Sequence, residues 1–271
     1  SDVYKRQTYI EGLKTVIVNN RVHTSYNLFG TTTGRLSSEK PNLQNIPNKT
    51  EMGQKIREFF VADSKHTFVI ADYSQIELRV LAHLSDDKNM INMLKNRDAD
   101  IHSETAAKIF NTNIDSVTKD MRRKAKEVNF GLIYGMESFG LSKSLDISKK
   151  EADELIKAYF GQFPKIKGFL EKIVVDATKN TYTETLYGRK RFIRELSSSN
   201  FQVKAMGKRI AMNAPIQGTA SDIMKIAMIK LIKKLSPLES TNLLLQIHDE
   251  IIIQTPNVLS DKVSNIMQKE M

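Results

Sequence analysis

Polar residues at the ends of apolar segments are the first candidates for chemistry. In LLLQIHDEIII, His248, Asp249 and Glu250 link two apolar runs, 243–247 and 251–254, that are typical of buried strands. A tight turn usually contains Gly or Asn, and neither is present, so turn formation alone explains these three residues poorly. Asp72 has a similar place, because it lies near the end of the apolar run FVIADY and directly before an expected helix. Two carboxylates at strand ends of one sheet can hold divalent cations such as Mg²⁺, which prefer oxygen ligands.

Two other interpretations of these carboxylates stay open. A solvated loop that is simply acidic has the same composition, and single aspartates at strand ends are common. The His-Asp pair of metal-dependent phosphohydrolases is disfavoured, because such a site needs further His ligands and the chain has only 5 His. If Asp72 and Asp249 meet, they could hold two metal ions about 3.5–4 Å apart, which is the arrangement that many phosphoryl-transfer enzymes use.

The segment KDMRRKAKEVNFGLIYG, residues 119–135, has two distinct faces when it is placed on a helix of about 100° per residue. The apolar face consists of Met121, Ala125, Val128 and Leu132. The opposite stripe, cationic at one end and aromatic at the other, consists of Arg122, Lys126, Phe130 and Tyr134. A nucleotide complements such a stripe, since its phosphates bind cations and its base or sugar stacks on rings. A helix buried on both sides, with incidental basic residues, is the alternative.

Other charged segments are less specific. The basic runs GRKRFIR at 188–194 and KAMGKR at 204–209 each resemble an ordinary solvated face. A further group next to an expected helix start consists of Asp98, Asp100, His102 and Glu104. Its composition would suit a metal site, but capping of the helix explains the spacing at least as well.

These residues require a scaffold of both strands and helices. The patterns predict strands at 68–73, 243–247 and 251–254, a helix over 75–84, and mostly helical structure over 86–205. After Asn213, the sequence Pro-Ile-Gln-Gly predicts a break before a helix from about Thr219 to Leu235. The order predicts an α+β fold in which one sheet domain is assembled from both ends of the chain around a helical insertion.

The overall composition favours a polyanionic partner. The 271 residues include 41 Lys and Arg against 31 Asp and Glu, a formal net charge of +10. The absence of Trp disfavours a membrane-surface helix, and the absence of Cys excludes disulfides, thiolate metal sites and cysteine nucleophiles. Since no apolar run approaches the length of a membrane span, we expect an intracellular protein without a membrane partner.

Several motifs, occurring in a fixed order from about Thr8 to the C-terminus, resemble the polymerase domain of family A DNA polymerases, the bacterial DNA polymerase I group. DYSQIELRVLAHLS at 72–85 is similar to motif A, RRKAKEVNFGLIYG at 122–135 to motif B, and QIHDE at 246–250 to motif C. TGRLSS with PNLQNIP, YGRKR and NAPIQGTASD match as well. The resemblance implies a right-hand architecture with an antiparallel-sheet palm and helical fingers, with the thumb mostly absent.

The resemblance also implies domains and a function. Residues 1–85 would be a thumb remnant and the N-terminal part of the palm, 86–205 the fingers, and 206–271 the C-terminal part of the palm. Because exonuclease domains and most of a thumb are missing, we expect a fragment of a longer protein. The implied activity is that of a DNA-directed DNA polymerase, a nucleotidyltransferase of DNA replication and repair that adds deoxynucleotides to a primer 3′ end. Its cofactors would be two Mg²⁺ ions, with Mn²⁺ as a substitute, and its partners primer-template DNA and deoxynucleoside triphosphates. We expect a monomer in the bacterial cytoplasm, associated with the nucleoid.

Site residues follow from the same resemblance. The catalytic set would be Asp72, Asp249, Glu250 and Lys126, with the metals held by Asp72, Asp249 and the backbone of Tyr73. The nucleotide would be bound by Arg122, Lys126, Phe130, Tyr134, Glu77, Gln75 and His102, where Glu77 crowds the sugar 2′ position and so selects deoxyribose. The DNA contacts would be Arg35, Gln44, Asn45, Lys49, Arg189, Arg209, Asn213, Gln217 and His248. Minor-groove acceptors are nearly sequence-independent, so Arg and Gln donors there can test the geometry of a base pair without reading sequence.

Two alternative functions stay open. A single-subunit RNA polymerase shares the two aspartates and the Arg/Lys/Tyr helix, although Glu77 and the QIHDE form argue against it. A DNA-binding fragment without catalytic activity is the other, because of the missing segments.

Overall fold

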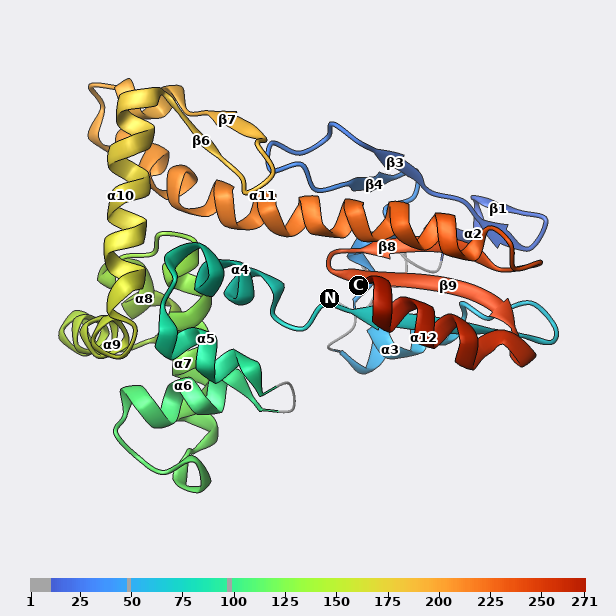
Figure 1. The fold of residues 1–271 in the computed structure, drawn as a ribbon, viewed down its shortest axis with the longest axis horizontal. Helices are drawn as coiled ribbons and strands as arrows, with labels where there is room; N and C mark the ends of the chain where they lie inside the picture. Colours follow the sequence, from blue (N-terminus) through green and yellow to red (C-terminus); the bar gives the residue numbers. More distant parts are fainter. Residues whose placement is uncertain (1–10, 48–49, 97–98) are drawn as a thin grey trace. The chain divides into compact units, whose positions relative to one another are not determined.

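The computed structural model describes residues 11–47, 50–96 and 99–271. The fold is α+β, with many helices and a small antiparallel sheet (Figure 1). The chain forms two compact units, which we call the sheet unit, residues 1–74 and 221–271, and the helical unit, residues 75–220. Among the described residues, none of the helices combines the length and apolar character that crossing a bilayer requires.

The sheet unit is built on a three-stranded antiparallel sheet with the order β5-β9-β8. β5 (His66–Asp72) comes from the N-terminal part of the chain, and β8 (Asn242–Ile247) and β9 (Glu250–Pro256) come from the C-terminal part. The expectation that both ends of the chain share one sheet is therefore confirmed. The expected strand at 68–73 is confirmed as part of β5, but β5 is an edge strand and Ile70 in it is 53% exposed.

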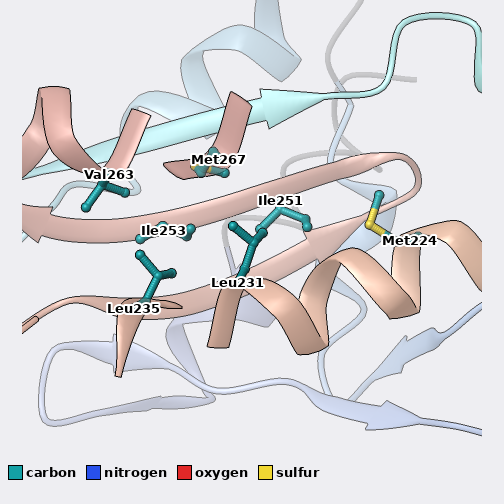
Figure 2. Packing of buried hydrophobic residues seen from close by; sticks show 7 residues of the cluster. All are labelled: Met224, Leu231, Leu235, Ile251, Ile253, Val263 and Met267. Atoms are coloured by element: carbon teal, nitrogen blue, oxygen red, sulfur yellow. The ribbon is translucent and has the colours of Figure 1, made fainter. Parts of the chain in front are cut away.

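A compact apolar core lies between the sheet and two helices of the sheet unit. Figure 2 shows Leu231 and Leu235 of α11 (Phe201–Leu235) pointing toward Ile251 and Ile253 of β9. The core cluster is completed by Met224 of α11 and by Val263 and Met267 of α12 (Ser260–Glu270). Each such side chain contributes about 1.5–3 kcal/mol on burial. This packing holds the register of β9, because a slip of one residue would turn the isoleucines to the other face.

The N-terminal part of the sheet unit adds short elements. They are α2 (Gly12–Lys14), β1 (Ile17–Val18), β2 (Arg21–Val22), β3 (Ser25–Asn27), β4 (Ser37–Glu39) and α3 (Glu51–Glu58). β1 pairs with β2, and β3 pairs with β4. The hydroxyl of Tyr26 donates to the carbonyl oxygen of Gln246 at 2.8 Å and accepts from its backbone N–H at 3.0 Å. The β3–β4 hairpin is thereby held against β8.

The helical unit confirms the expected predominance of helix over 86–205. Its elements are α4 (Ile76–Ser85), α5 (Lys88–Lys95), α6 (Ile101–Ile109), α7 (Lys119–Ile133), α8 (Ser138–Leu145), α9 (Lys149–Gln162), α10 (Pro164–Asn180), β6 (Tyr182–Glu184), β7 (Lys190–Phe192) and the first part of α11. Side-chain caps begin several of these helices, namely Asp87 before α5, Asp100 before α6, Thr118 before α7 and Ser148 before α9.

The predicted break after Asn213 is wrong, because α11 continues without interruption from Phe201 to Leu235 with Pro215 inside it. An internal proline removes one helical hydrogen bond and costs about 3 kcal/mol. Packing offsets this cost, since the residues around the proline are small or apolar and buried: Ala211, Ala214, Ile216 and Ala220. Local propensity is overruled by burial at this position.

Candidate active site

Three carboxylates gather at one end of the sheet. Asp72 is the last residue of β5 and lies opposite Glu250, the first residue of β9. The backbone N–H of Tyr73 donates to the carbonyl oxygen of Asp249 at 3.0 Å, so the β8–β9 turn lies beside the end of β5. We call Asp72, Asp249 and Glu250 the acidic site.

The link between β8 and β9 is shorter than expected. Ile247 pairs with Glu250, so the turn consists of His248 and Asp249 alone, and Glu250 belongs to the strand. His248 has a φ of +54°, a left-handed conformation that favours Gly or Asn. Gln246 supports this backbone through a hydrogen bond from its side-chain amide to the carbonyl oxygen of His248. Backbone strain of this kind is concentrated at functional sites.

The carboxyl groups of the acidic site are poorly compensated. Desolvation raises the pKa of Asp72. Desolvation also raises the pKa of Asp249, and the charge of Asp72 adds to this, although Arg35, 3.8 Å away, opposes it. Desolvation also raises the pKa of Glu250. The positive charge of Arg57 lowers this pKa, and the negative charge of Asp72 raises it further. Mutual repulsion of this kind is relieved by a bound cation.

The acidic site fits a divalent ion that shares its ligands with a substrate. The described part of the chain has no group of three or more His, Cys, Asp or Glu residues arranged to hold a metal by itself. However, the carboxylates of Asp72 and Asp249 lie at one end of the sheet, and desolvation raises the pKa of both. Mg²⁺ often binds through one or two carboxylates and takes its other ligands from water and substrate phosphates. The residues present match that kind of site.

A cavity of about 290 Å³ opens beside the acidic site within the sheet unit. It is lined by Gln44, Asn45, Ile46, Arg57, Asp72, Ile247, His248 and Glu250. The side-chain amide of Gln44 donates to the carbonyl oxygen of Gln246 at 3.2 Å and to its Oε1 at 3.1 Å. Four of the expected DNA contacts, Arg35, Gln44, Asn45 and His248, thus lie near the acidic site, whereas Lys49 lies outside the described residues.

Helix α7 has the two faces that its sequence predicts. On the apolar face Ala125, Val128 and Leu132 are buried and Met121 is half-buried. On the opposite side, which we call the α7 stripe, Arg122 is exposed, Lys126 and Phe130 are half-buried, and Tyr134, directly after the helix, is 41% exposed. The alternative of a helix buried on both sides is therefore excluded.

Arg122 is already paired with an anion. Its Nε donates to Oδ2 of Asp100 at 2.5 Å, and its Nη2 donates to Oδ1 at 3.2 Å. Asp100 also caps α6 by accepting from the backbone N–H of His102 and from the hydroxyl of Ser103. Desolvation raises the pKa of Asp100, but hydrogen bonds from Arg122 and Ser103 bring it down to about 2. The capping interpretation of Asp100 is thus confirmed, while Asp98 lies outside the described residues.

His102 lies beside the α7 stripe as a buried, neutral imidazole. It is 6% exposed, its ring centroid is 5.6 Å from that of Phe130, and its Nδ1 lies 3.2 Å from the amide nitrogen of Asn129. Desolvation is the main reason that the pKa of His102 is lowered to about 4. The positive charges of Arg122 and Lys126 also lower this pKa, whereas the negative charge of Asp100 raises it. At neutral pH this ring can hydrogen-bond but carries no charge.

The aromatic end of the stripe is tied to α4. The carboxylate of Glu77, which is 5% exposed, accepts a hydrogen bond from the hydroxyl of Tyr134 at 3.1 Å. Gln75 precedes α4 with a φ of +55°. Gly135 follows Tyr134 with a φ of +66°, and a Cβ there would lie only 3.1 Å from the Cα of Arg209. The end of α7 can therefore approach α11 closely only because residue 135 has no side chain.

The other expected DNA contacts of the helical unit lie on two elements. Arg189 is in the turn between β6 and β7, and Arg209, Asn213 and Gln217 are on α11. The amide nitrogen of Asn213 is buried without a hydrogen-bond partner in the described structure. Their contacts with DNA stay predictions.

Several roles at the site were not expected from the sequence, although Asp100 itself was singled out as a helix cap. Arg57 lines the cavity next to Glu250, and Asp100 neutralises Arg122 from 22 positions away. Asn129, on the buried side of α7, holds the ring of His102. Only the helical period could have indicated Asn129 as a buried polar residue.

Known proteins are similar to this chain in both sequence and fold. The sequence model of the family described as DNA polymerase family A matches residues 3–271 of this chain. The chain is 47% identical to DNA polymerase I of Caldicellulosiruptor bescii over 267 residues and to that of Bacillus subtilis over 271 residues. It is 43% identical to the thermostable DNA polymerase I of Thermus aquaticus over 268 residues. These matches cover 97–98% of this chain and 31–32% of the relatives.

A solved structure agrees with these relatives. It is described as the POL domain of Pol1 from M. smegmatis in complex with DNA primer-template and dNTP, and it superposes with a TM-score of 0.94 at 39% identity. The match covers 99% of this chain and 48% of that one. The chain spans about a third of the length of the curated relatives that it matches. On the evidence of sequence and fold together, the chain belongs to DNA polymerase family A.

Proposed function

We propose that this protein extends a DNA primer on a template, joining deoxynucleoside triphosphates to the primer 3′ end in DNA replication and repair. The bond formed joins the primer 3′ oxygen to the α-phosphorus, and the bond broken releases pyrophosphate. The observation that carries this proposal is the acidic site, where two aspartates from distant parts of the chain lie together at the end of one sheet. The named relatives and the DNA-bound neighbour support it.

Asp72 and Asp249, with the backbone carbonyl of Tyr73, would hold two divalent ions, Mg²⁺ or in its place Mn²⁺. When bound, such ions activate the attacking hydroxyl and stabilise the leaving group. The acidic site suits cations, because desolvation raises the pKa values of its carboxyl groups and the charge of Asp72 raises those of Asp249 and Glu250 further. Glu250 would lie near the primer end.

The α7 stripe would bind the incoming nucleotide. Arg122 and Lys126 suit the triphosphate, Phe130 and Tyr134 suit the base and sugar, and His102 would donate a hydrogen bond as a neutral ring. Gln75 and the buried carboxylate of Glu77 would face the sugar, where Glu77 leaves no room for a 2′ hydroxyl. A preference for ribonucleotides over deoxyribonucleotides would instead favour an RNA polymerase.

In this proposal the sheet unit is the palm and the helical unit is the fingers. The segments 1–85 and 206–271 lie mostly in the sheet unit and 86–205 lies in the helical unit, which supports this assignment. Duplex DNA would be held by Arg35, Gln44, Asn45, Lys49, Arg189, Arg209, Asn213, Gln217 and His248. We further propose that the protein acts as a monomer on the DNA of a bacterial nucleoid.

Primer extension tests the proposal. With Mg²⁺, four deoxynucleoside triphosphates and a primed template, we expect the chain to synthesise the complementary strand. Asp249→Asn should lower the rate by about 10²–10³-fold, because metal binding supplies several kcal/mol of transition-state stabilisation. The control is Asp261→Asn, an exposed aspartate of α12. An unchanged rate in Asp249→Asn, or a wild-type chain that binds DNA without extending it, would contradict the proposal.

A further inference from the structure

Arg57 is a cation of the sheet unit that the expected site residues do not include. It lies in the last turn of α3, and its side chain lines the same cavity as Asp72 and Glu250. The other polar residues of that cavity wall are Gln44, Asn45 and His248. Arg57 therefore brings a positive charge to the wall of the cavity that Asp72 and Glu250 also line.

Two buried polar atoms at this cavity lack partners. Nε of Arg57 and Oε1 of Glu250 are both shielded from solvent, and neither makes a hydrogen bond within the described parts of the chain. A buried donor or acceptor is usually satisfied, because leaving it unpaired costs free energy. Because both residues line the cavity, a ligand that satisfied these two atoms would have to supply both an acceptor and a donor.

The charges at the cavity narrow the chemistry of that ligand. The wall of the cavity carries the positive charge of Arg57 beside the negative charges of Asp72 and Glu250. The planar guanidinium offers its donors in a fork that matches a phosphate group. A phosphodiester followed by a free hydroxyl has both parts required, since the phosphate accepts from Arg57 and the hydroxyl can donate to a carboxylate.

We propose that Arg57 binds the last phosphodiester of the primer strand and so positions the primer 3′ hydroxyl at the acidic site. This inference rests on the proposed function. It assigns the cavity to the primer end and leaves the triphosphate to the cations of α7.

The test combines a protein variant with a primer variant. Binding of a fluorescent primer-template to the whole chain is measured by anisotropy in the absence of nucleotide. The primer is either unmodified or carries one neutral methylphosphonate, which replaces the last phosphodiester linkage or the fifth linkage from the 3′ end. For the wild type, we expect neutralising the last linkage to weaken binding by about tenfold, the scale of one charge-assisted contact. Arg57→Ala should bind the unmodified primer about tenfold more weakly and should be insensitive to the modification at the last linkage.

The comparison contains its own controls. Lys55→Ala, a change of an exposed side chain on the same helix, should bind all three primers as the wild type does. Arg57→Lys keeps the charge without the fork, so we expect an intermediate loss, and it replaces Arg57→Ala if that variant does not fold. Variants of Arg57 that stay as sensitive as the wild type to the last linkage would overturn the inference. A wild-type chain that binds no primer-template at all would instead refute the proposed function.

Discussion

The acidic site of the sheet unit and the α7 stripe of the helical unit hold their charges differently. At the acidic site, desolvation raises the pKa values of three carboxyl groups, the charge of Asp72 raises those of Asp249 and Glu250 further, and one carboxylate oxygen has no hydrogen-bond partner among the described residues. On the α7 stripe, Arg122 is neutralised by Asp100 through two hydrogen bonds, and the nearby His102 is uncharged. Lys126 is the cation of the stripe for which the described structure shows no ion pair.

The difference separates two ways of preparing for a charged ligand. A cation that binds the acidic site relieves existing repulsion, so the cost of keeping the carboxylates together is already part of the folded state. An anion that binds Arg122 has to compete with Asp100. Because the Arg122–Asp100 pair is substantially exposed, it contributes at most about 1 kcal/mol to stability. A phosphate can therefore displace Asp100 from Arg122 at little cost.

Lys126 should carry the larger share of nucleotide binding on α7. We expect Lys126→Ala to lower kcat/KM for nucleotide by about 10- to 100-fold, because it removes a charge-assisted contact that no internal anion weakens. Steady-state primer extension at varied nucleotide concentration measures this. The control is Lys119→Ala, an exposed lysine at the start of the same helix. Equal losses in both variants would show that net charge, not position on the stripe, binds the nucleotide.

Acid should destabilise the protein through His102. Its folded-state pKa, about 4, is below the ordinary value of 6.5, so the unfolded chain binds the proton more readily. Stability is therefore lost as the pH falls from 6.5 toward 4, and between pH 7 and pH 5 the loss is about 2 kcal/mol.

Urea unfolding of wild type and His102→Gln at the two pH values measures this loss. The variant should lose less stability on acidification, whereas His83→Gln, at an exposed position of α4, should behave as the wild type. An identical pH dependence in wild type and His102→Gln would show that the ring is not held neutral.

The acidic site should respond to acid in the opposite direction. Its carboxyl groups have raised folded-state pKa values, so the folded protein binds their protons more readily and gains stability as the pH falls through those values. Without added metal, Asp249→Asn should therefore unfold at a higher urea concentration than wild type at pH 7. Asp261→Asn serves again as the control. A less stable Asp249→Asn would mean that attraction to Arg35 outweighs desolvation and the repulsion from Asp72.

The smallest effect is expected at Asp100. Asp100→Asn keeps a side chain that can cap α6 but removes the charge that occupies Arg122, so nucleotide should bind up to about fivefold more tightly. Equilibrium binding of nucleotide to the primer-template complex measures this. The matched control is Asp120→Asn, which removes the partner of the neighbouring Arg123. Weaker binding in Asp100→Asn would mean that Asp100 orients Arg122 rather than competing for it.

Periodic patterns made much of this arrangement predictable. The apolar runs around Asp72 and Asp249 predict strands, and the two faces of α7 follow from spacing alone, because both depend on which residues are buried. The continuity of α11 through Pro215 was not predictable, since its cause is burial of the surrounding helix. The pairing of Arg122 with Asp100 and the place of Arg57 depend on packing between elements, which leaves no local mark in the sequence.

The central claim is that Asp72 and Asp249 act together as one metal-binding unit. The most direct measurement is the single-turnover rate of primer extension for Asp72→Asn, Asp249→Asn and the double variant at saturating Mg²⁺. We predict that each single change costs about 10²–10³-fold and that the double variant is little worse than either, as for residues that work as a unit. Losses that multiply in the double variant, or a single variant with the wild-type rate, would contradict it.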